Sequence, residues 1–276
     1  AYVINDAFMK FLFSEIALFQ AVFLRSIITV PPVLLMVWVT KVTLRNLAKQ
    51  DIRLIGLRVG AEICTTIAFL TALKYMPLAN VTAILQALPL AVTMAAALFL
   101  AEPIGWRRWS AILVGFMGVL IVVRPGLDGF NVYSLSALAA IIFITVREIA
   151  TRKLAQEVPT ITVVLSTAIG SAVFAGIMMV GAEWHAVSTS SWLLLIGAAF
   201  AVLIATLLSV MAMRTGEIGF VSPFRYTSML GAIGLGILMF GEWPDQPTLA
   251  GTVIIVMTGI YTFHREQKIS RGVTAA

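Results

Sequence analysis

The chain has 276 residues, of which 60% are apolar and only 12% are charged, and its mean hydropathy is +1.00. A soluble domain carries about 25% charged residues, so water is excluded as the solvent for most of this surface. The single cysteine, Cys64, excludes a disulfide framework and a cysteine-based metal site. The net charge of +6 does not indicate a nucleic-acid partner, because the cations lie in short segments between apolar runs, as in membrane proteins.

Apolar runs follow one another along the whole chain, and most of them have about the length of a bilayer span. The long runs cover residues 16–39, 54–76, 78–101, 107–123, 131–153, 160–181, 191–213, 218–241 and 247–263. An earlier run, from Ala1 to about Phe13, is shorter than the roughly 20 residues of a span, so we expect the beginning of this first helix to be missing. Spanning segments must satisfy their own backbone hydrogen bonds, so the sequence predicts an all-α polytopic membrane protein with ten transmembrane helices.

The second half of the chain repeats the layout of the first. The stretch 72–124 aligns without a gap with 212–264, which lies 140 residues later. The aligned polar residues are Lys74 with Arg214, Thr82 with Ser222, and Glu102 with Glu242, and just upstream of the stretch Thr66 aligns with Thr206. A period this long is half of the chain rather than a solenoid repeat. We therefore expect two five-helix repeats, over residues 1–130 and 131–276, the second ending in a short cytoplasmic tail.

Lysine and arginine are distributed unevenly between the two sides of this topology. With the N-terminus in the cytoplasm, the inside segments hold Lys41, Arg45, Lys49, Arg53, Arg107, Arg108, Arg147, Arg152, Lys153, Arg214, Arg265, Lys268 and Arg271. The outside segments hold only Lys10, Lys74 and Arg124. The positive-inside rule therefore predicts that both termini are cytoplasmic.

An odd number of helices in each half forces the second repeat into the membrane with the opposite orientation. The result is an inverted-topology repeat, with a pseudo-two-fold axis in the membrane plane. Transporters of this design bind substrate near the midplane, between the halves. Two halves that exchange conformations give inward-open and outward-open states of similar energy, so the sequence indicates alternating access.

Polar side chains share one face on several of the predicted helices. A charge at the bilayer centre costs about 2.5–3.5 kcal/mol, so we expect these faces to turn inward. The candidates for lining a substrate cavity are Glu62, Thr66, Thr82, Gln86, Thr206, Ser222, Arg225 and Tyr226. A structural role stays open for each, because Ser and Thr in such helices often bond to their own backbone or join helices. Glu62 can pair with Arg58 or Arg225, and Arg225 fits either a substrate carboxylate or a structural ion pair.

Three carboxylates inside the predicted spans can carry a coupling proton: Asp6, Glu62 and Glu148. Proton coupling and uncoupled facilitation both stay open. Two prolines are hinge candidates. Pro89 removes a backbone hydrogen bond in mid-helix and is expected to bend the chain beside Gln86, whereas Pro223 fits a first helical turn.

Motifs for other chemistry are absent from the sequence. Neither histidine, His185 or His264, has a metal-ligand companion in sequence, and HExxH, GxSxG, P-loop and dinucleotide fingerprints do not occur. We therefore expect no metal and no cofactor, and ATP-driven transport would need another subunit.

Two matching segments carry a family resemblance: FLAEPIGWRRWSAILVGFMGVLIVVRP (99–125) and LMFGEWPDQPTLAGTVIIVMTGIYTFHR (239–265). Together with NDAFMK (5–10), REIATR (147–152) and the ten-span layout, they resemble the EamA branch of the drug/metabolite transporter superfamily. The resemblance implies a multi-pass secondary transporter of the bacterial inner membrane that exports amino acids or related small metabolites. It does not fix the substrate.

Two further classes of function were weighed against transport. A non-transporting membrane scaffold or partner subunit is the main alternative, although the chain has little extramembrane mass with which to bind. An intramembrane enzyme of lipid or isoprenoid chemistry would need Asp, Glu or His clustered at one depth, whereas the carboxylates here are scattered. We expect a non-enzyme whose partners are a small molecule, the lipid bilayer and, if transport is coupled, protons. Two halves complete a ten-helix unit, which favours a monomer.

Overall fold

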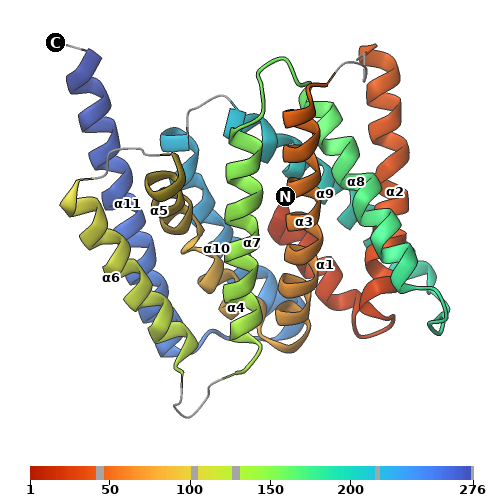
Figure 1. The fold of residues 1–276 in the computed structure, drawn as a ribbon. Coiled ribbons are helices and arrows are strands. Elements are labelled where there is room, and N and C mark those ends of the chain that lie inside the picture. The colour runs from red at the N-terminus through yellow and green to blue at the C-terminus, as the bar shows by residue number, and fades with distance from the viewer. Residues whose placement is uncertain (42–46, 101–104, 126–130, 215–217, 275–276) are drawn as a thin grey trace. The chain divides into compact units, whose positions relative to one another are not determined.

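The structure is a computed structural model that describes residues 1–41, 47–100, 105–125, 131–214 and 218–274, in which all regular structure is helical (Figure 1). Side chains are described in these ranges except at 100, 107–108, 218–225 and 262–274. The helices are α1 (Tyr2–Leu12), α2 (Leu18–Thr40), α3 (Lys49–Tyr75), α4 (Leu78–Leu85), α5 (Leu88–Leu100), α6 (Trp106–Val123), α7 (Ser134–Arg152), α8 (Thr160–Met178), α9 (Thr189–Arg214), α10 (Ile218–Phe240) and α11 (Gln246–Thr274).

Within the described residues, six helical stretches are long and apolar enough to cross a membrane. They are Leu18–Thr40, Lys49–Tyr75, Leu78–Phe99, Ser134–Arg152, Thr160–Met178 and Thr189–Arg214. Three shorter apolar helices of 10–17 residues, Trp109–Val123, Tyr226–Phe240 and Gln246–Tyr261, fall at the other predicted spans. The helical, polytopic class is therefore as predicted, and the full number of ten spans stays a prediction.

Proline and glycine mark the boundaries of several helices. Proline precedes the first residue of α4 and of α8, where a missing N–H costs little. Gly241 adopts φ +65° after α10, and its N–H donates to the carbonyl of Ile237 at 3.0 Å. This left-handed glycine with its bond to the carbonyl four residues earlier is an αL cap, and the N–H of Glu242 donates to the Gly236 carbonyl at 3.0 Å.

The run predicted as one helix over 78–101 is two helices, α4 and α5, with a break at Gln86 and Ala87. Pro89 explains the position of this break. A proline has no N–H, so it leaves the Leu85 carbonyl without its usual helical donor. At the break, the N–H of Ala87 bonds to the carbonyl of Ile84, three residues earlier, at 3.1 Å. A bond of this span makes a tighter turn than the α-helical bond to the fourth residue back.

The chain packs into two compact units, residues 1–70 with 146–215, and 71–145 with 216–276. Each unit combines parts of both predicted sequence halves, and α3 and α7 contribute residues to both units. The halves 1–130 and 131–276 rest on sequence similarity, whereas the units rest on packing. Packing into units does not test similarity between the halves, so the two five-helix repeats stay a prediction.

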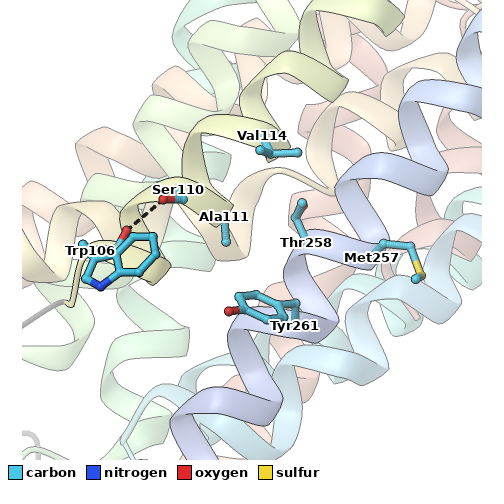
Figure 2. Close-up of a pocket in the computed structure, with 7 residues that line it drawn as sticks. All are labelled: Trp106, Ser110, Ala111, Val114, Met257, Thr258 and Tyr261. Carbon is cyan, nitrogen blue, oxygen red and sulfur yellow. Dashed lines mark hydrogen bonds between the residues drawn. The ribbon is translucent and has the colours of Figure 1, made fainter.

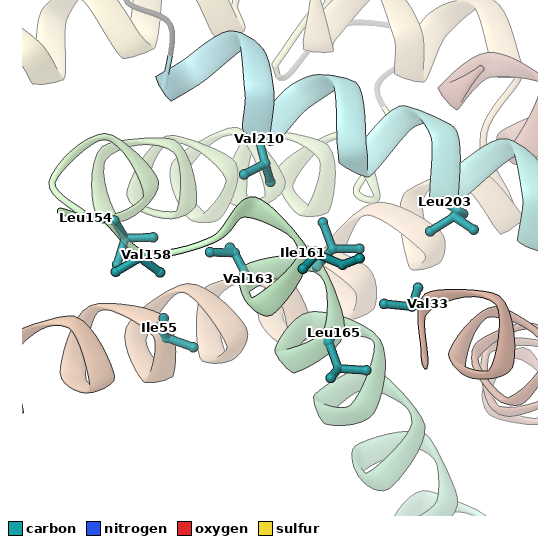
Figure 3. Packing of buried hydrophobic residues seen from close by; sticks show 10 residues of the cluster. Val33, Ile55, Leu154, Val158, Ile161, Val163, Leu165, Leu203 and Val210 are labelled. Carbon is teal, nitrogen blue, oxygen red and sulfur yellow. The ribbon is translucent and has the colours of Figure 1, made fainter. Parts of the chain in front are cut away.

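In the first unit, α2 packs against α8 and α9, and α1 packs against α9. An apolar cluster lies between α2, α3, α8 and α9 (Figure 3). Its buried members are Val33, Ile55, Leu154, Val158, Ile161, Val163, Val164, Leu165, Leu203 and Val210. Small residues allow close approach elsewhere in the unit: a Cβ at Gly197 of α9 would come within 2.8 Å of the Phe8 ring of α1. Because side-chain packing is what joins helices in lipid, these contacts hold the unit together.

In the second unit, α6 packs against α11 and α4 packs against α10. Glycines bring α6 and α11 together, since a Cβ at Gly118 would lie 2.9 Å from Ile255 and one at Gly115 would lie 3.0 Å from Thr258. A later residue of α6 thus meets an earlier residue of α11, so the two helices run antiparallel. The close approach of small residues is how helices associate in lipid.

Candidate functional site

A buried ion cluster joins α3 to α7 in the first unit. The guanidinium of Arg147 donates to the Glu62 carboxylate at 2.7 Å and to the Glu148 carboxylate at 2.6 Å. Arg147 and Glu148 are 6% and 3% exposed. The hydroxyl of Ser209, on α9, lies 3.5 Å from the same Glu148 oxygen. One arginine therefore holds two carboxylates from different helices.

A second buried arginine lies one turn away on α3. Arg58, 2% exposed, donates through Nε to the Thr151 hydroxyl at 2.8 Å and through Nη1 to the Thr167 hydroxyl. Both threonine hydroxyls also donate to a carbonyl of their own helix, that of Arg147 at 2.7 Å and that of Val163 at 2.8 Å. Arg58 thus ties α3 to α7 and α8, and Glu62 takes Arg147 as its ion-pair partner.

A third buried arginine lies on α2 and reaches α1. Arg25 donates to the Asn5 side-chain oxygen at 2.9 Å, and the Asn5 amide donates to the Asp6 carboxylate at 2.9 Å. All three residues are under 10% exposed. Asp6 is therefore linked to a cation through an asparagine rather than by direct contact.

The charged groups just described are three arginines and three carboxylates. They are Arg25, Arg58 and Arg147, and Asp6, Glu62 and Glu148. Burying ions costs several kcal/mol each unless opposite charges and hydrogen bonds compensate. The hydrogen bonds above supply that compensation. A cluster of this kind in an apolar helical body is a weak contribution to stability and a strong candidate for function.

Two polar groups near the cluster have hydrogen-bonding capacity to spare. The Arg147 Nε and the Thr65 hydroxyl are buried and find no acceptor or donor among the described residues. A buried polar atom without a partner costs about 1–3 kcal/mol. Arg147 and Thr65 therefore keep unused hydrogen-bonding capacity within the described part of the first unit.

The second unit has its own polar contacts around the α4–α5 break. The Gln86 side chain, 3% exposed, donates to the Ser228 hydroxyl of α10 at 3.0 Å. Glu242, which follows α10, accepts the N–H of Leu78 at 2.9 Å and so caps the first turn of α4. The helix that it caps is α4, distant in sequence, rather than the following α11.

The predicted site residues fall into two groups. Glu62, Thr66 and Thr206 lie in the first unit with Asp6 and Glu148, and Thr82, Gln86, Pro89 and Tyr226 lie in the second. Thr66 and Thr206 are half-buried, whereas Thr82 and Tyr226 are buried. Ser222, Pro223 and Arg225 belong to α10, but their side chains lie outside the described residues.

Sequence reasoning missed the central role of Arg147. Its place near the end of a predicted span led us to count it among the cytoplasmic cations. The structure corrects this, because Arg147 lies within α7, buried and ion-paired. The sequence did contain a signal for this role, because Arg147 and Glu148 are adjacent charged residues inside the otherwise apolar run 131–153. The remaining inside cations still outnumber those outside.

Among the described residues, no group of three or more His, Cys, Asp or Glu could hold a metal ion. The fold and the site therefore define a class: a helical, multi-pass membrane protein with a buried network of paired charges.

Comparison with protein families shows to which family of membrane proteins this chain belongs. The EamA-like transporter family model matches residues 1–124 and again residues 132–263, so the chain belongs to this family of membrane transporters. The two matches divide the chain close to the border between the predicted repeats.

Several characterised bacterial proteins are similar to this chain. A riboflavin transporter of Vibrio cholerae is 30% identical over 217 residues, covering 78% of this chain and 72% of that protein. An S-adenosylmethionine uptake transporter of Rickettsia conorii is 26% identical over 271 residues, covering 96% and 89%. The pseudopaline exporter CntI of Pseudomonas aeruginosa is 25% identical over 216 residues, covering 78% and 76%.

A solved crystal structure has the same fold, with a TM-score of 0.68 over 94% of this chain and 95% of that chain. Its sequence identity is 18%, so the likeness concerns the fold alone.

Proposed function

We propose that this protein is a secondary transporter that moves amino acids or related small metabolites across the bacterial inner membrane by alternating access. The observation that carries this proposal is the buried ion cluster in the first unit, in which Arg147 pairs with both Glu62 and Glu148. A free amino acid carries an ammonium and a carboxylate. A site with both arginines and carboxylates complements these two charges.

The unsatisfied groups of the cluster support a polar substrate. The Nε of Arg147 and the hydroxyl of Thr65 are buried, with no partner among the described residues, and each can bond to a ligand. Relatives carry cargoes as different as riboflavin and S-adenosylmethionine, and their names include both uptake and export. The direction proposed here is export.

Helix packing supports the inverted repeat on which alternating access depends. Shifting by 140 residues maps the contact of Gly115 with Thr258 onto that of Ile255 with Gly118, and both contacts occur. The two helices involved are antiparallel. A two-fold axis perpendicular to helices that cross the membrane lies in the membrane plane. The contacts of Leu78 with Glu242 and of Gln86 with Ser228 indicate the same antiparallel relation for α4 and α10.

The proposal includes the expectations from the sequence that the structure does not test. Both termini are cytoplasmic, the protein acts as a monomer and is not an enzyme, and Pro89 acts as a hinge. Of the three coupling candidates, Glu148 is the proton carrier that we select, because its carboxylate meets both Arg147 and the Ser209 hydroxyl of α9. Protonation of one carboxylate leaves Arg147 paired with the other, so the cluster tolerates a change of one charge.

Flux in proteoliposomes tests this function. The purified chain is reconstituted and offered a panel of labelled amino acids, riboflavin and S-adenosylmethionine, with and without an imposed pH gradient. We expect flux of one chemical class, a large loss in Glu62→Gln, and unchanged flux in Glu183→Gln, whose carboxylate is exposed. We expect Glu148→Gln to keep substrate exchange but to lose the response to the pH gradient.

The alternative is a non-transporting scaffold or partner subunit. Absence of flux for the whole panel, in protein that is monodisperse and helical by circular dichroism, would favour that function. Equal flux in Glu62→Gln and Glu183→Gln would keep transport but remove the charged cluster from the site.

A further inference from the structure

A groove lies between α6 and α11 on the surface of the second unit (Figure 2). Its volume is about 420 Å³, within the range of about 300–1,000 Å³ that small-molecule sites occupy. It is lined by Trp106, Ser110, Ala111, Val114, Met257, Thr258 and Tyr261. Ala111, 6% exposed, lies deep in the groove, and Trp106 and Met257, 72% and 63% exposed, lie at its rim.

The walls of the groove offer hydrocarbon rather than hydrogen bonds. The Ser110 hydroxyl donates to the Trp106 carbonyl at 3.0 Å, drawn as a dashed line in Figure 2. The Thr258 hydroxyl bonds to the carbonyls of Ile254 and Ile255, both at 2.9 Å. Because both hydroxyls bond to their own helices, the surface facing the groove is mostly apolar. A hydrocarbon chain matches such a surface.

One end of the groove carries the marks of a membrane interface. Trp106 and Tyr261 lie there, and aromatic residues with a polar tip are enriched at the level of lipid headgroups. In sequence, Arg107 and Arg108 follow Trp106 at the beginning of α6. Because α11 runs antiparallel to α6, its continuation beyond Tyr261 brings further cations, Arg265, Lys268 and Arg271, to the same end. Basic segments at this depth attract anionic headgroups.

We propose that this groove is a binding site for an anionic glycerophospholipid. One acyl chain lies along Ala111, Val114 and Met257, and the phosphate lies at the cationic end formed by α6 and α11. The lipid would hold together two helices that approach each other closely at Gly115, Gly118 and Gly251. The proposal does not depend on the transported substrate, and its test needs no flux.

Native mass spectrometry of the detergent-purified full chain tests the site. After removal of bound lipid, phosphatidylglycerol or phosphatidylcholine with the same acyl chains is added. We expect retained adducts with phosphatidylglycerol and fewer with phosphatidylcholine. Val114→Trp fills the groove and is expected to lose the adduct. Leu113→Trp, a neighbour on α6 that is 65% exposed and does not line the groove, is expected to keep it.

Two further variants separate the tail site from the headgroup site. Met257→Trp blocks the groove from α11 and is expected to act like Val114→Trp. The double variant Arg107→Gln with Arg108→Gln is expected to lose the preference for phosphatidylglycerol. Equal adducts in Val114→Trp and Leu113→Trp, both folded by circular dichroism, would overturn the proposal. So would a dimer of this chain that forms without lipid and is lost in Val114→Trp, because the occupant would then be a second copy.

Discussion

Tyr226 of α10 occupies the space that a side chain at Gly259 of α11 would need. A Cβ built on Gly259 overlaps the Tyr226 hydroxyl and ring, while Tyr226 itself is 7% exposed. A glycine at position 259 therefore lets a bulky aromatic ring lie between two helices of the second unit. This contact gives one of the predicted site residues a fixed position.

We predict that Gly259→Ala lowers the melting temperature of the purified protein. The added methyl group must displace Tyr226, and overpacking of this kind costs about 1–3 kcal/mol. The control is Gly234→Ala on α10, where an added Cβ meets no atom within 4 Å. Equal melting temperatures for the two variants would mean that Tyr226 does not fill the Gly259 position. The double variant Gly259→Ala with Tyr226→Phe should recover only part of the loss, because the ring carbons beside the removed hydroxyl also lie too close to the added Cβ.

We predict that Arg147→Gln destabilises the protein strongly. Removing one partner of a buried ion pair costs about 3–5 kcal/mol, because the carboxylates of Glu62 and Glu148 would remain without their cation. Chemical unfolding in detergent measures the change. Lys153→Gln, at an exposed position that follows α7, is the control and should have little effect. In a double-mutant cycle, Glu62→Gln should cost less in the Arg147→Gln background than alone. Simple additivity would contradict the pairing.

We predict that Gln20→Met loosens the segment between α8 and α9. The Gln20 side chain, fully buried, donates to the His185 carbonyl at 2.6 Å and accepts the His185 N–H at 3.0 Å. Methionine keeps the volume but offers neither bond. Hydrogen–deuterium exchange should rise in the peptide that contains His185. Gln156→Met, at an exposed position, should leave that exchange unchanged, and unchanged exchange in both variants would exclude a role for Gln20.

We predict a small loss of stability below about pH 4 that depends on Asp245. Burial raises the pKa of the Asp245 carboxyl, but the hydrogen bonds from Arg124 and Thr248 outweigh burial and hold this pKa below its ordinary value. Asp245 accepts the Thr248 N–H at 3.0 Å and so caps the beginning of α11. A lowered folded-state pKa stabilises the protein above the ordinary pKa of about 3.9, and this stabilisation is lost as the pH falls through the folded value.

The measurement for Asp245 is the melting temperature between pH 7 and pH 3. The wild type should lose more stability than Asp245→Asn across the acidic part of this range. The side chain of Asp245 is 48% exposed, so the ion pair with Arg124 is worth only about 0.2–1 kcal/mol. Arg124→Gln should reduce the acid effect in the same direction. An identical pH profile for Asp245→Asn and wild type would contradict the assignment.

The helices could be predicted from the sequence because each apolar run is local. The run 160–181 became α8, Thr160–Met178, and the run 191–213 became α9, Thr189–Arg214. The break beside Gln86 could also be predicted, because Pro89 has no N–H to donate to the carbonyl four residues earlier. These features depend only on residues close together in the chain.

Side-chain partners were harder to predict because they depend on which helices meet. Glu62 had candidate partners in Arg58, four residues earlier, and in Arg225. Its ion-pair partner is Arg147, 85 residues away in sequence. Helical periodicity tells which face a residue occupies but not which other helix covers that face. The contact between Tyr226 and Gly259 could not be predicted for the same reason.

The division into compact units has a consequence for biosynthesis. The first unit needs residues 1–70 and 146–215, and the second needs 71–145 and 216–276. When the ribosome has finished α3, neither α8 nor α9 yet exists, so α1 and α2 must wait in the bilayer without their packing partners. The early helices therefore depend on their own backbone hydrogen bonds and on lipid for that interval. During that interval Arg58 also lacks Thr151 and Thr167, the two hydroxyls to which it donates in the folded unit, because both are synthesised later.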